Sequence, residues 1–201
     1  MKTALLALLF AGAAFGQAWQ NVDFTLLVGA AHVQSSVVET TTGPATVSGS
    51  AAFVFQFGFG YQLTATKAGT LYLEIPQTYG FYAASEIQGA ATTSLSRTTW
   101  CFAPGVRFKL PTEKRVSLYG ALGAGIQNLS TNYTLINDQL STTGGDALRP
   151  VLDTGAGIDL RLSRWISLRF DFRDYISFGT APPFHPSHNH LVGLAGVAFH
   201  R

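Results

Sequence analysis

Large apolar residues alternate with small or polar residues along segment after segment of this chain. The clearest case puts six large side chains on one face of a single segment: Phe53, Phe55, Phe57, Phe59, Tyr61 and Leu63. Because successive side chains of a β-strand point to opposite faces, a period of two predicts strands. The same alternation marks seven further segments, at 24–28, 71–75, 100–110, 116–127, 153–162, 166–173 and 191–199. Eight is an even number, as a closed antiparallel membrane barrel requires.

The segments between these strands alternate in length. Short connections are expected near 65–70, 111–115 and 163–165, and long ones near 35–50, 78–97, 129–148 and 177–189. Barrels of the bacterial outer membrane show this asymmetry, with tight turns on the periplasmic side and longer loops outside. The order of short and long connections therefore agrees with the strand count.

Composition decides which face of the barrel points outward. Charged residues make up 12% of the chain, whereas a soluble domain carries roughly 25%. A soluble barrel of the lipocalin type would turn its apolar face inward, but six large side chains from one strand would overfill the interior of eight strands. No run after the N-terminal segment is long enough for a transmembrane helix, so a membrane crossing must use strands. The sequence therefore predicts an all-β fold, an eight-stranded antiparallel up-and-down transmembrane β-barrel.

The first residues predict export from the cytoplasm. Met1 and Lys2 form a short positive start, Ala4 to Ala14 are apolar, and small residues follow, as in a cleavable signal peptide. We expect the signal peptide at 1–18 and the outer-membrane β-barrel domain at 19–201. The single cysteine, Cys101, excludes an internal disulfide and is expected to face the barrel interior as a free thiol.

Charged residues recur on the face that would point into the barrel. Four carboxylates and five bases are expected to share this narrow space: Glu74, Arg107, Lys109, Asp153, Asp159, Arg161, Arg169, Asp171 and Arg173. Unpaired charges would be costly there, so they should form a hydrogen-bonded ion network. Such a network could be a structural filling of the barrel, or a gate whose ion pairs exchange partners and open a narrow water path.

Four aromatic residues lie near the ends of the predicted strands. Trp100, Phe108, Trp165 and Tyr175 are expected to form an aromatic girdle where the membrane meets water.

Few residues suggest other chemistry. His185 and Ser187 are similar to the Ser–His pair of outer-membrane lipid A deacylases, but neighbouring prolines place them in a loop. His185, His188 and His190 have irregular spacing for a metal site. No basic patch indicates nucleic-acid binding. We therefore expect no catalytic residues, no metal and no cofactor.

The last strands resemble those of a known group. The segment from Ser167 to Tyr175 is similar to the penultimate strand of the outer-membrane β-barrel domain family, which includes OmpA-like, OmpX-like and OmpW-like barrels. The closing segment, with Gly193, Gly196 and Phe199, is similar to the last strand of such proteins. The resemblance implies insertion by the outer-membrane assembly machinery, which reads a last strand ending in an aromatic residue. Here His200 and Arg201 follow Phe199.

These observations predict a protein of the cell outer membrane. The first hypothesis is a monomeric, non-enzymatic barrel with a structural or interaction role through its barrel and surface loops. Its partners would be outer-membrane lipid, lipopolysaccharide and the assembly machinery, and not nucleic acid. The alternatives are a narrow channel for ions or small solutes, and an outer-leaflet lipid-modifying enzyme such as a lipid A deacylase.

Overall fold

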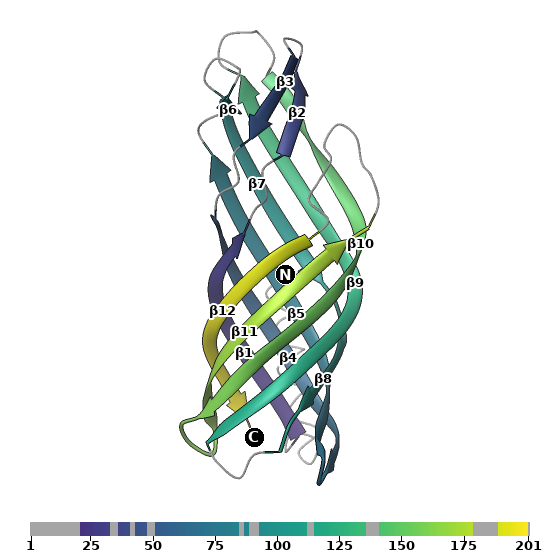
Figure 1. The fold of residues 1–201 in the computed structure, drawn as a ribbon, viewed down its shortest axis with the longest axis vertical. Helices are drawn as coiled ribbons and strands as arrows, with labels where there is room; N and C mark the ends of the chain where they lie inside the picture. Colours follow the sequence, from purple (N-terminus) through teal and green to yellow (C-terminus); the bar gives the residue numbers. More distant parts are fainter. Residues whose placement is uncertain are drawn as a thin grey trace, which may run out of the picture.

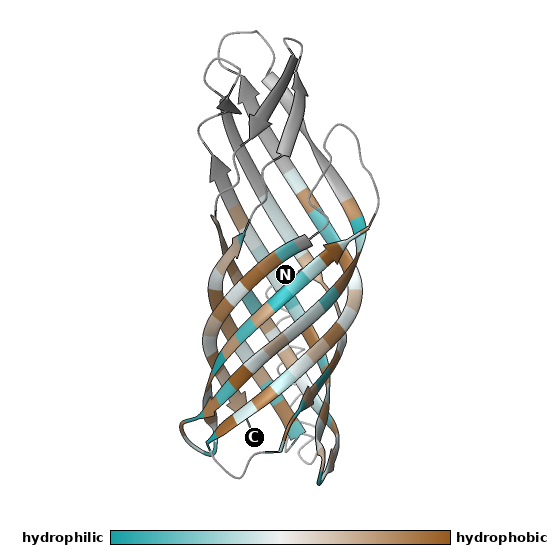
Figure 2. Cartoon of the chain, in the orientation of Figure 1, coloured by the Kyte–Doolittle hydropathy of each residue, from teal (hydrophilic) through white to brown (hydrophobic). Residues whose placement is uncertain are grey.

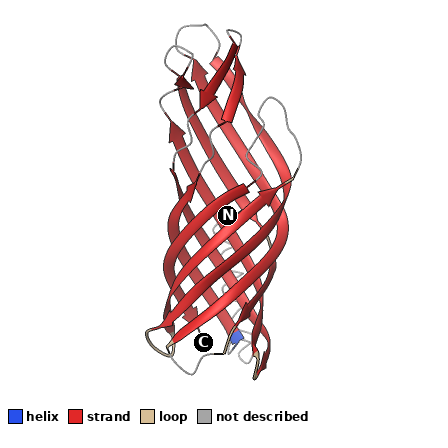
Figure 3. Cartoon of the chain, in the orientation of Figure 1, coloured by secondary structure: helices blue, strands red, loops and turns tan. Residues whose placement is uncertain are grey.

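The chain folds into a closed antiparallel barrel, shown here as a computed structural model (Figures 1 and 3). The structure describes residues 21–32, 36–40, 43–47, 51–84, 87–88, 93–111, 115–135, 141–178 and 189–200. The barrel strands are β1 (Val22–His32), β4 (Ala51–Thr66), β5 (Gly69–Ala84), β7 (Thr93–Phe102), β8 (Gly105–Lys109), β9 (Val116–Leu135), β10 (Ser141–Arg161), β11 (Ile166–Ser177) and β12 (Asn189–His200). No helix among these residues is long and apolar enough to cross a membrane.

Strands β7 and β8 are two halves of one barrel strand, which gives the eight strands that the alternation predicts. Both pair with β5 on one side and with β9 on the other. Ala103 and Pro104 separate them, and a proline has no N–H to donate to a neighbouring strand. The carbonyl of Pro104 still accepts a hydrogen bond from the N–H of Ala124 at 3.1 Å. The wall of the barrel is therefore continuous across this break.

The barrel is closed by the pairing of the first strand with the last. Strand β1 runs antiparallel to β12, from Asp23 opposite His200 to His32 opposite Leu191. On its other edge β1 pairs with β4, and β12 pairs with β11. Every barrel strand thus has a hydrogen-bonded neighbour on both edges, so neither end of the sheet is left open to pair with another chain.

The two ends of the barrel differ, and the strands continue far beyond the residues where loops were expected. Three tight connections, between β4 and β5, β8 and β9, and β10 and β11, lie together at one end (Figure 1). At the other end the predicted long loops at 78–97 and 129–148 are wrong for most of their length, because β5, β7, β9 and β10 run through them. These Ser- and Thr-rich segments lack apolar alternation, but their backbones pair with neighbouring strands and so form strands.

A second, small sheet lies at the end with the longer connections (Figure 1). It consists of β2 (Ser36–Thr40), β3 (Gly43–Val47) and β6 (Ile87–Gln88). Strands β2 and β3 fall in the predicted long loop at 35–50. The prediction at 177–189 lies mostly outside the described residues, as does the predicted signal peptide.

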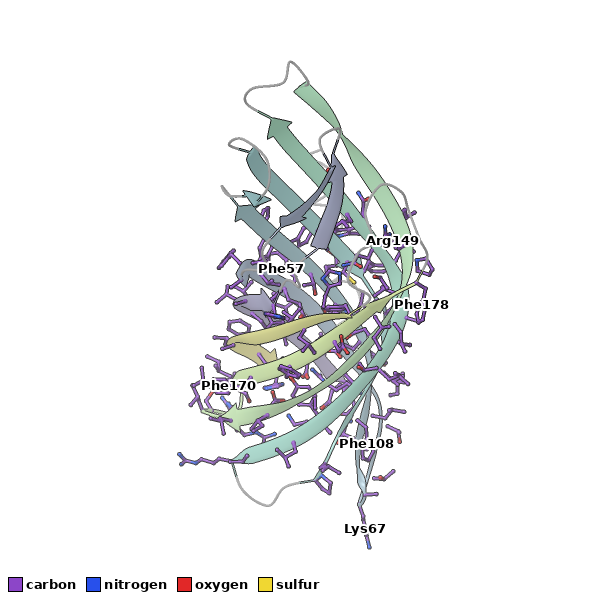
Figure 4. The ribbon with its side chains drawn as sticks, turned by 45° about the horizontal axis from the view of Figure 1, so that its top comes forward. Phe57, Lys67, Phe108, Arg149, Phe170 and Phe178 are labelled. Atoms are coloured by element: carbon purple, nitrogen blue, oxygen red, sulfur yellow. The ribbon has the colours of Figure 1, made fainter. Side chains whose placement is uncertain are left out.

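The two faces of the barrel wall carry the two halves of the alternating pattern. Figure 2 shows alternating hydrophobic and hydrophilic residues along the strands. On β4, Phe57 is 41% exposed while its neighbour Gln56 is 1% exposed. On β11, Phe170 is 47% exposed and Arg169 only 1%, and Figure 4 shows Phe170 on the outside of the wall. Such a broad apolar surface suits lipid and not water, so the large residues point outward as predicted.

The interior has two parts along the barrel axis. Toward the short connections it holds charged side chains. Toward the other end it holds many small or apolar ones, among them Ala31, Ala52, Val54 and Val192, together with polar ones such as Gln127, around a cavity of about 40 Å³. A cavity of this size accommodates a few water molecules at most. Cys101 lies in this apolar part as a buried free thiol, facing inward as predicted.

Candidate functional site

The charged residues inside the barrel come from six strands and form one network. Alternation on β11 turns Ser167, Arg169, Asp171 and Arg173 inward, while the residues between them face outward. Strands β1, β5, β8, β10 and β12 contribute the remaining members: Asp23, Glu74, Arg107, Lys109, Asp153, Asp159 and His200. Because every strand turns alternate residues to the same space, residues far apart in sequence become neighbours.

Arg173 is the centre of the first part of the network. Its guanidinium donates to Asp153 at 2.6 Å and to Asp171 at 2.9 Å, and it lies 3.0 Å from Glu74. The Arg173 side chain is 1% exposed. One buried cation therefore neutralises carboxylates from three different strands, and the geometry is that of strong charge-assisted hydrogen bonds.

Arg107 extends the network toward the short connections. It donates to Asp23 at 2.5 Å and to Glu74 at 3.4 Å. The guanidinium also lies 4.7 Å from the ring of Tyr72 and 5.5 Å from that of Tyr119. The rings cover the faces of the cation, where attraction to the π-system compensates part of its desolvation.

Asp159 is the centre of the third part of the network. Arg169 donates to it through two nitrogens, at 2.7 and 2.8 Å, in the bidentate geometry that suits a guanidinium and a carboxylate. Lys109 donates to the same carboxylate at 2.7 Å. Arg169 also lies 3.8 Å from Asp23, which links this part to Arg107.

A histidine joins the network at the barrel seam. Nδ1 of His200 lies 2.7 Å from Oδ1 of Asp23, and Nε2 of the same ring lies 2.8 Å from Oγ of Ser167. The sequence-based set contained none of these three residues. The signal that could have found them is the parity of the first and last strands, which puts Asp23 and His200 on the inward face opposite each other.

Arg161 does not share the enclosed interior with the other predicted charges. It is exposed at the last position of β10, where the turn at 162–165 begins. Arg161 lies outside, while Asp23 and Arg149 lie inside, so the enclosed set has five carboxylates and five bases: Asp23, Glu74, Asp153, Asp159 and Asp171, and Arg107, Lys109, Arg149, Arg169 and Arg173.

The predicted girdle residues lie in different environments. Phe108 and Trp165 are exposed on the outer surface, and the Arg164 guanidinium lies 4.9 Å from the Trp165 ring. Trp100 is partly exposed and stacks on Phe102, with 6.3 Å between ring centroids.

Tyr175 does not belong to the girdle. It is 2% exposed, and its hydroxyl shares a hydrogen bond of 2.7 Å with that of Thr78 inside the barrel. Residues two positions apart on a strand face the same side of the sheet. Tyr175 lies two residues from the inward-facing Arg173 and therefore also faces inward.

The structure describes only part of the histidine-rich segment near the C-terminus. His185, Ser187 and His188 lie outside the described residues, while His190 lines the small apolar cavity. Within the described ranges, no three His, Cys, Asp or Glu side chains come together as metal ligands.

Comparison with known proteins identifies the class of barrel. The sequence profile of the outer membrane protein beta-barrel domain matches residues 2–195. The structure is similar to Neisserial surface protein A, with a TM-score of 0.58, 14% identity and coverage of 89% of this chain and 97% of that one. It is also similar to the outer membrane protease OmpT from Escherichia coli, with a TM-score of 0.57, 7% identity and coverage of 90% and 97%. For the attachment invasion locus protein Ail of Yersinia pestis the values are 0.50, 13%, 89% and 98%. At these identities the likeness concerns the fold alone, and no curated protein matches the chain by sequence.

Proposed function

The chain belongs to the outer membrane protein beta-barrel domain family and is a protein of the outer membrane, and from that starting point we propose that it serves as a closed anchor. In this role the barrel holds the outer strands and loops at the cell surface and does not conduct solutes. The partners would be lipid, lipopolysaccharide or other components of the cell envelope.

One observation carries this proposal: large charged side chains fill the part of the barrel interior toward the short connections. Arg107, Arg169 and Arg173 are each 1% exposed, and each is bound by at least two carboxylates. An eight-stranded barrel is just wide enough for its own side chains. A solute path would therefore require at least one of these arginines to leave its partners.

The strands also extend beyond the thickness of the membrane. A transmembrane strand needs roughly 9–11 residues, whereas β9 has 20 residues and β10 has 21. The short connections mark the periplasmic end, so the excess length projects from the outer surface together with the β2–β3–β6 sheet. This projecting part of the described strands offers a surface for contacts with envelope components.

A narrow channel is the second candidate, and the contacts of Arg173 are the observation that favours it. Arg173 contacts three carboxylates, and one oxygen each of Asp153 and Asp171 has no hydrogen-bond partner among the described residues. Exchange of partners among these carboxylates would displace the guanidinium without leaving it unpaired. A lipid-modifying activity that uses His185 and Ser187 depends on residues outside the described ranges.

Single-channel recording distinguishes the anchor from the channel. Residues 19–201, refolded in detergent and shown to be closed by heat-modifiable gel mobility, are inserted into planar lipid bilayers. We expect only rare openings from the wild-type protein and from Lys67→Ala, a charge-removing control at the exposed tip of the β4–β5 turn (Figure 4). Steady wild-type conductance that changes in Glu74→Ala or Arg107→Ala, and not in Lys67→Ala, would replace the anchor by the channel.

A further inference from the structure

Three polar side chains at the periplasmic end of the barrel form a row that the anchor role does not require. His200 Nδ1 lies 2.7 Å from Asp23 Oδ1, and His200 Nε2 lies 2.8 Å from Ser167 Oγ. A carboxylate can only accept, so Nδ1–H donates to Asp23; in the neutral imidazole, Nε2 then accepts the hydroxyl hydrogen of Ser167. A base within hydrogen-bond reach of a serine, oriented by a third group, is the arrangement that makes a serine nucleophilic.

The fold holds this row from three neighbouring strands. Asp23 is on β1, His200 on β12 and Ser167 on β11. Strand β12 lies between the other two, with His200 opposite Asp23 and Ala198 opposite Ser167. The imidazole therefore has a hydrogen-bonding partner on each side, set by the register of the closed barrel.

Burial limits what could reach the row. Asp23 and Ser167 are buried, and the His200 side chain is 17% exposed at the last position of β12. Of these three side chains His200 is the most exposed, and it lies at the end of β12 toward the short connections. Ser167 itself is 1% exposed, so the candidate substrate is a small acyl ester and not a long lipid chain.

Two arginines lie close to the row. The second carboxylate oxygen of Asp23 binds Arg107 and lies 3.8 Å from Arg169 Nη2. Arg169 also lies two residues from Ser167 on the same inward face of β11. Fixed positive charge near a reacting carbonyl favours the negative charge that develops on its oxygen.

We propose that Ser167, His200 and Asp23 form a serine-nucleophile site at the periplasmic mouth of the barrel, acting on small acyl esters. Ser167 Oγ bonds to the carbonyl carbon as its proton passes to His200 Nε2. The carbon–oxygen bond to the leaving group breaks, and the leaving oxygen takes that proton. Water then attacks the acyl-serine by the same route, which releases a carboxylic acid and restores Ser167. This activity is additional to the anchor role, does not depend on it, and departs from the expectation that the chain is not an enzyme.

Covalent labelling with a small fluorophosphonate is the primary test. Residues 19–201 are refolded in detergent, closure is checked by heat-modifiable mobility, and the adduct is located by mass spectrometry of peptides. We expect one adduct, on Ser167, and none in Ser167→Ala. In His200→Gln and Asp23→Asn the labelling rate should fall about 100-fold, as expected when a positioned base is lost or misoriented. Ser163→Ala removes an exposed serine from the neighbouring turn and should leave labelling unchanged.

Hydrolysis of p-nitrophenyl acetate by the same proteins tests the full cycle, and we expect it to follow the labelling rates. A closed wild-type barrel that leaves Ser167 unlabelled would overturn the proposal and leave the row as a hydrogen-bonded seam between strands. Labelling at an equal rate in His200→Gln would also overturn it. The wild-type result decides even if a variant fails to close, and conductance of the same preparation tests the anchor role separately.

Discussion

Replacing Arg173 with methionine tests most directly whether the interior network holds the barrel together. The guanidinium contacts Asp153, Asp171 and Glu74 at 2.6 to 3.0 Å and is 1% exposed. Methionine fills part of the same volume but neutralises no charge. Removing one partner from a buried ion pair costs about 3–5 kcal/mol, because an uncompensated charge stays buried. Arg173→Met leaves Asp153 and Asp171 in this state, whereas Glu74 keeps Arg107, so we expect a loss near the upper end of that range.

Lys109→Met is the matched control, since it also removes one positive charge from the interior. Among the described residues the ion pair of Lys109 is with Asp159, its side chain is 12% exposed, and Asp159 keeps both hydrogen bonds from Arg169. We therefore expect a loss of about 1 kcal/mol or less, as for partly solvated pairs. Adding Asp153→Asn to Arg173→Met should recover part of the lost stability, because it removes one of the carboxylate charges that the first substitution leaves unpaired.

Urea unfolding in detergent micelles, followed by tryptophan fluorescence, measures these differences. The midpoint for Arg173→Met should fall at an unchanged slope, which indicates a change in stability and not in the surface exposed on unfolding. If Arg173→Met lost no more stability than Lys109→Met, burial and pairing would not determine the energetics of the interior, and the reasoning would be refuted.

Three further outcomes follow from single contacts. Tyr175→Phe removes the buried hydrogen bond to Thr78 and should lower the free energy of unfolding by about 1 kcal/mol, measured by the same urea titration. Gly196→Ala should reduce the fraction of heat-modifiable, closed barrel, because a Cβ at Gly196 would collide with the backbone of β1, whereas Gly193→Ala, which meets nothing within 4 Å, should not. Cys101 is buried in the interior and should react with a maleimide only after unfolding; rapid labelling of the closed barrel would contradict the packing described.

Period-two alternation was sufficient to predict the barrel and its inside-out polarity, because each strand alone determines which of its residues face lipid. Applying the same parity consistently also predicts that Tyr175 faces inward, two residues from Arg173, although aromatic character suggested an interfacial position. The extension of β9 and β10 beyond the membrane could not be read from alternation, since those segments have no apolar face to reveal.

It was harder to predict from the sequence which residues of the network contact each other. That Asp23 and His200 meet depends on the register of β1 against β12, which no local pattern specifies. The exposure of Arg161 depends on the position at which β10 ends and its turn begins. Parity indicates on which side of the wall a residue lies, whereas neighbours within the interior depend on how eight strands are staggered.

The contact between the first and last barrel strands also constrains how the protein reaches its folded state. Asp23 and His200 are 177 positions apart in the chain, and contacts of such long sequence separation make folding slow. Until β12 is present, any partial barrel exposes two unpaired strand edges, which readily pair with other chains. Closure of the barrel therefore has to wait until β12 is present to pair with β1.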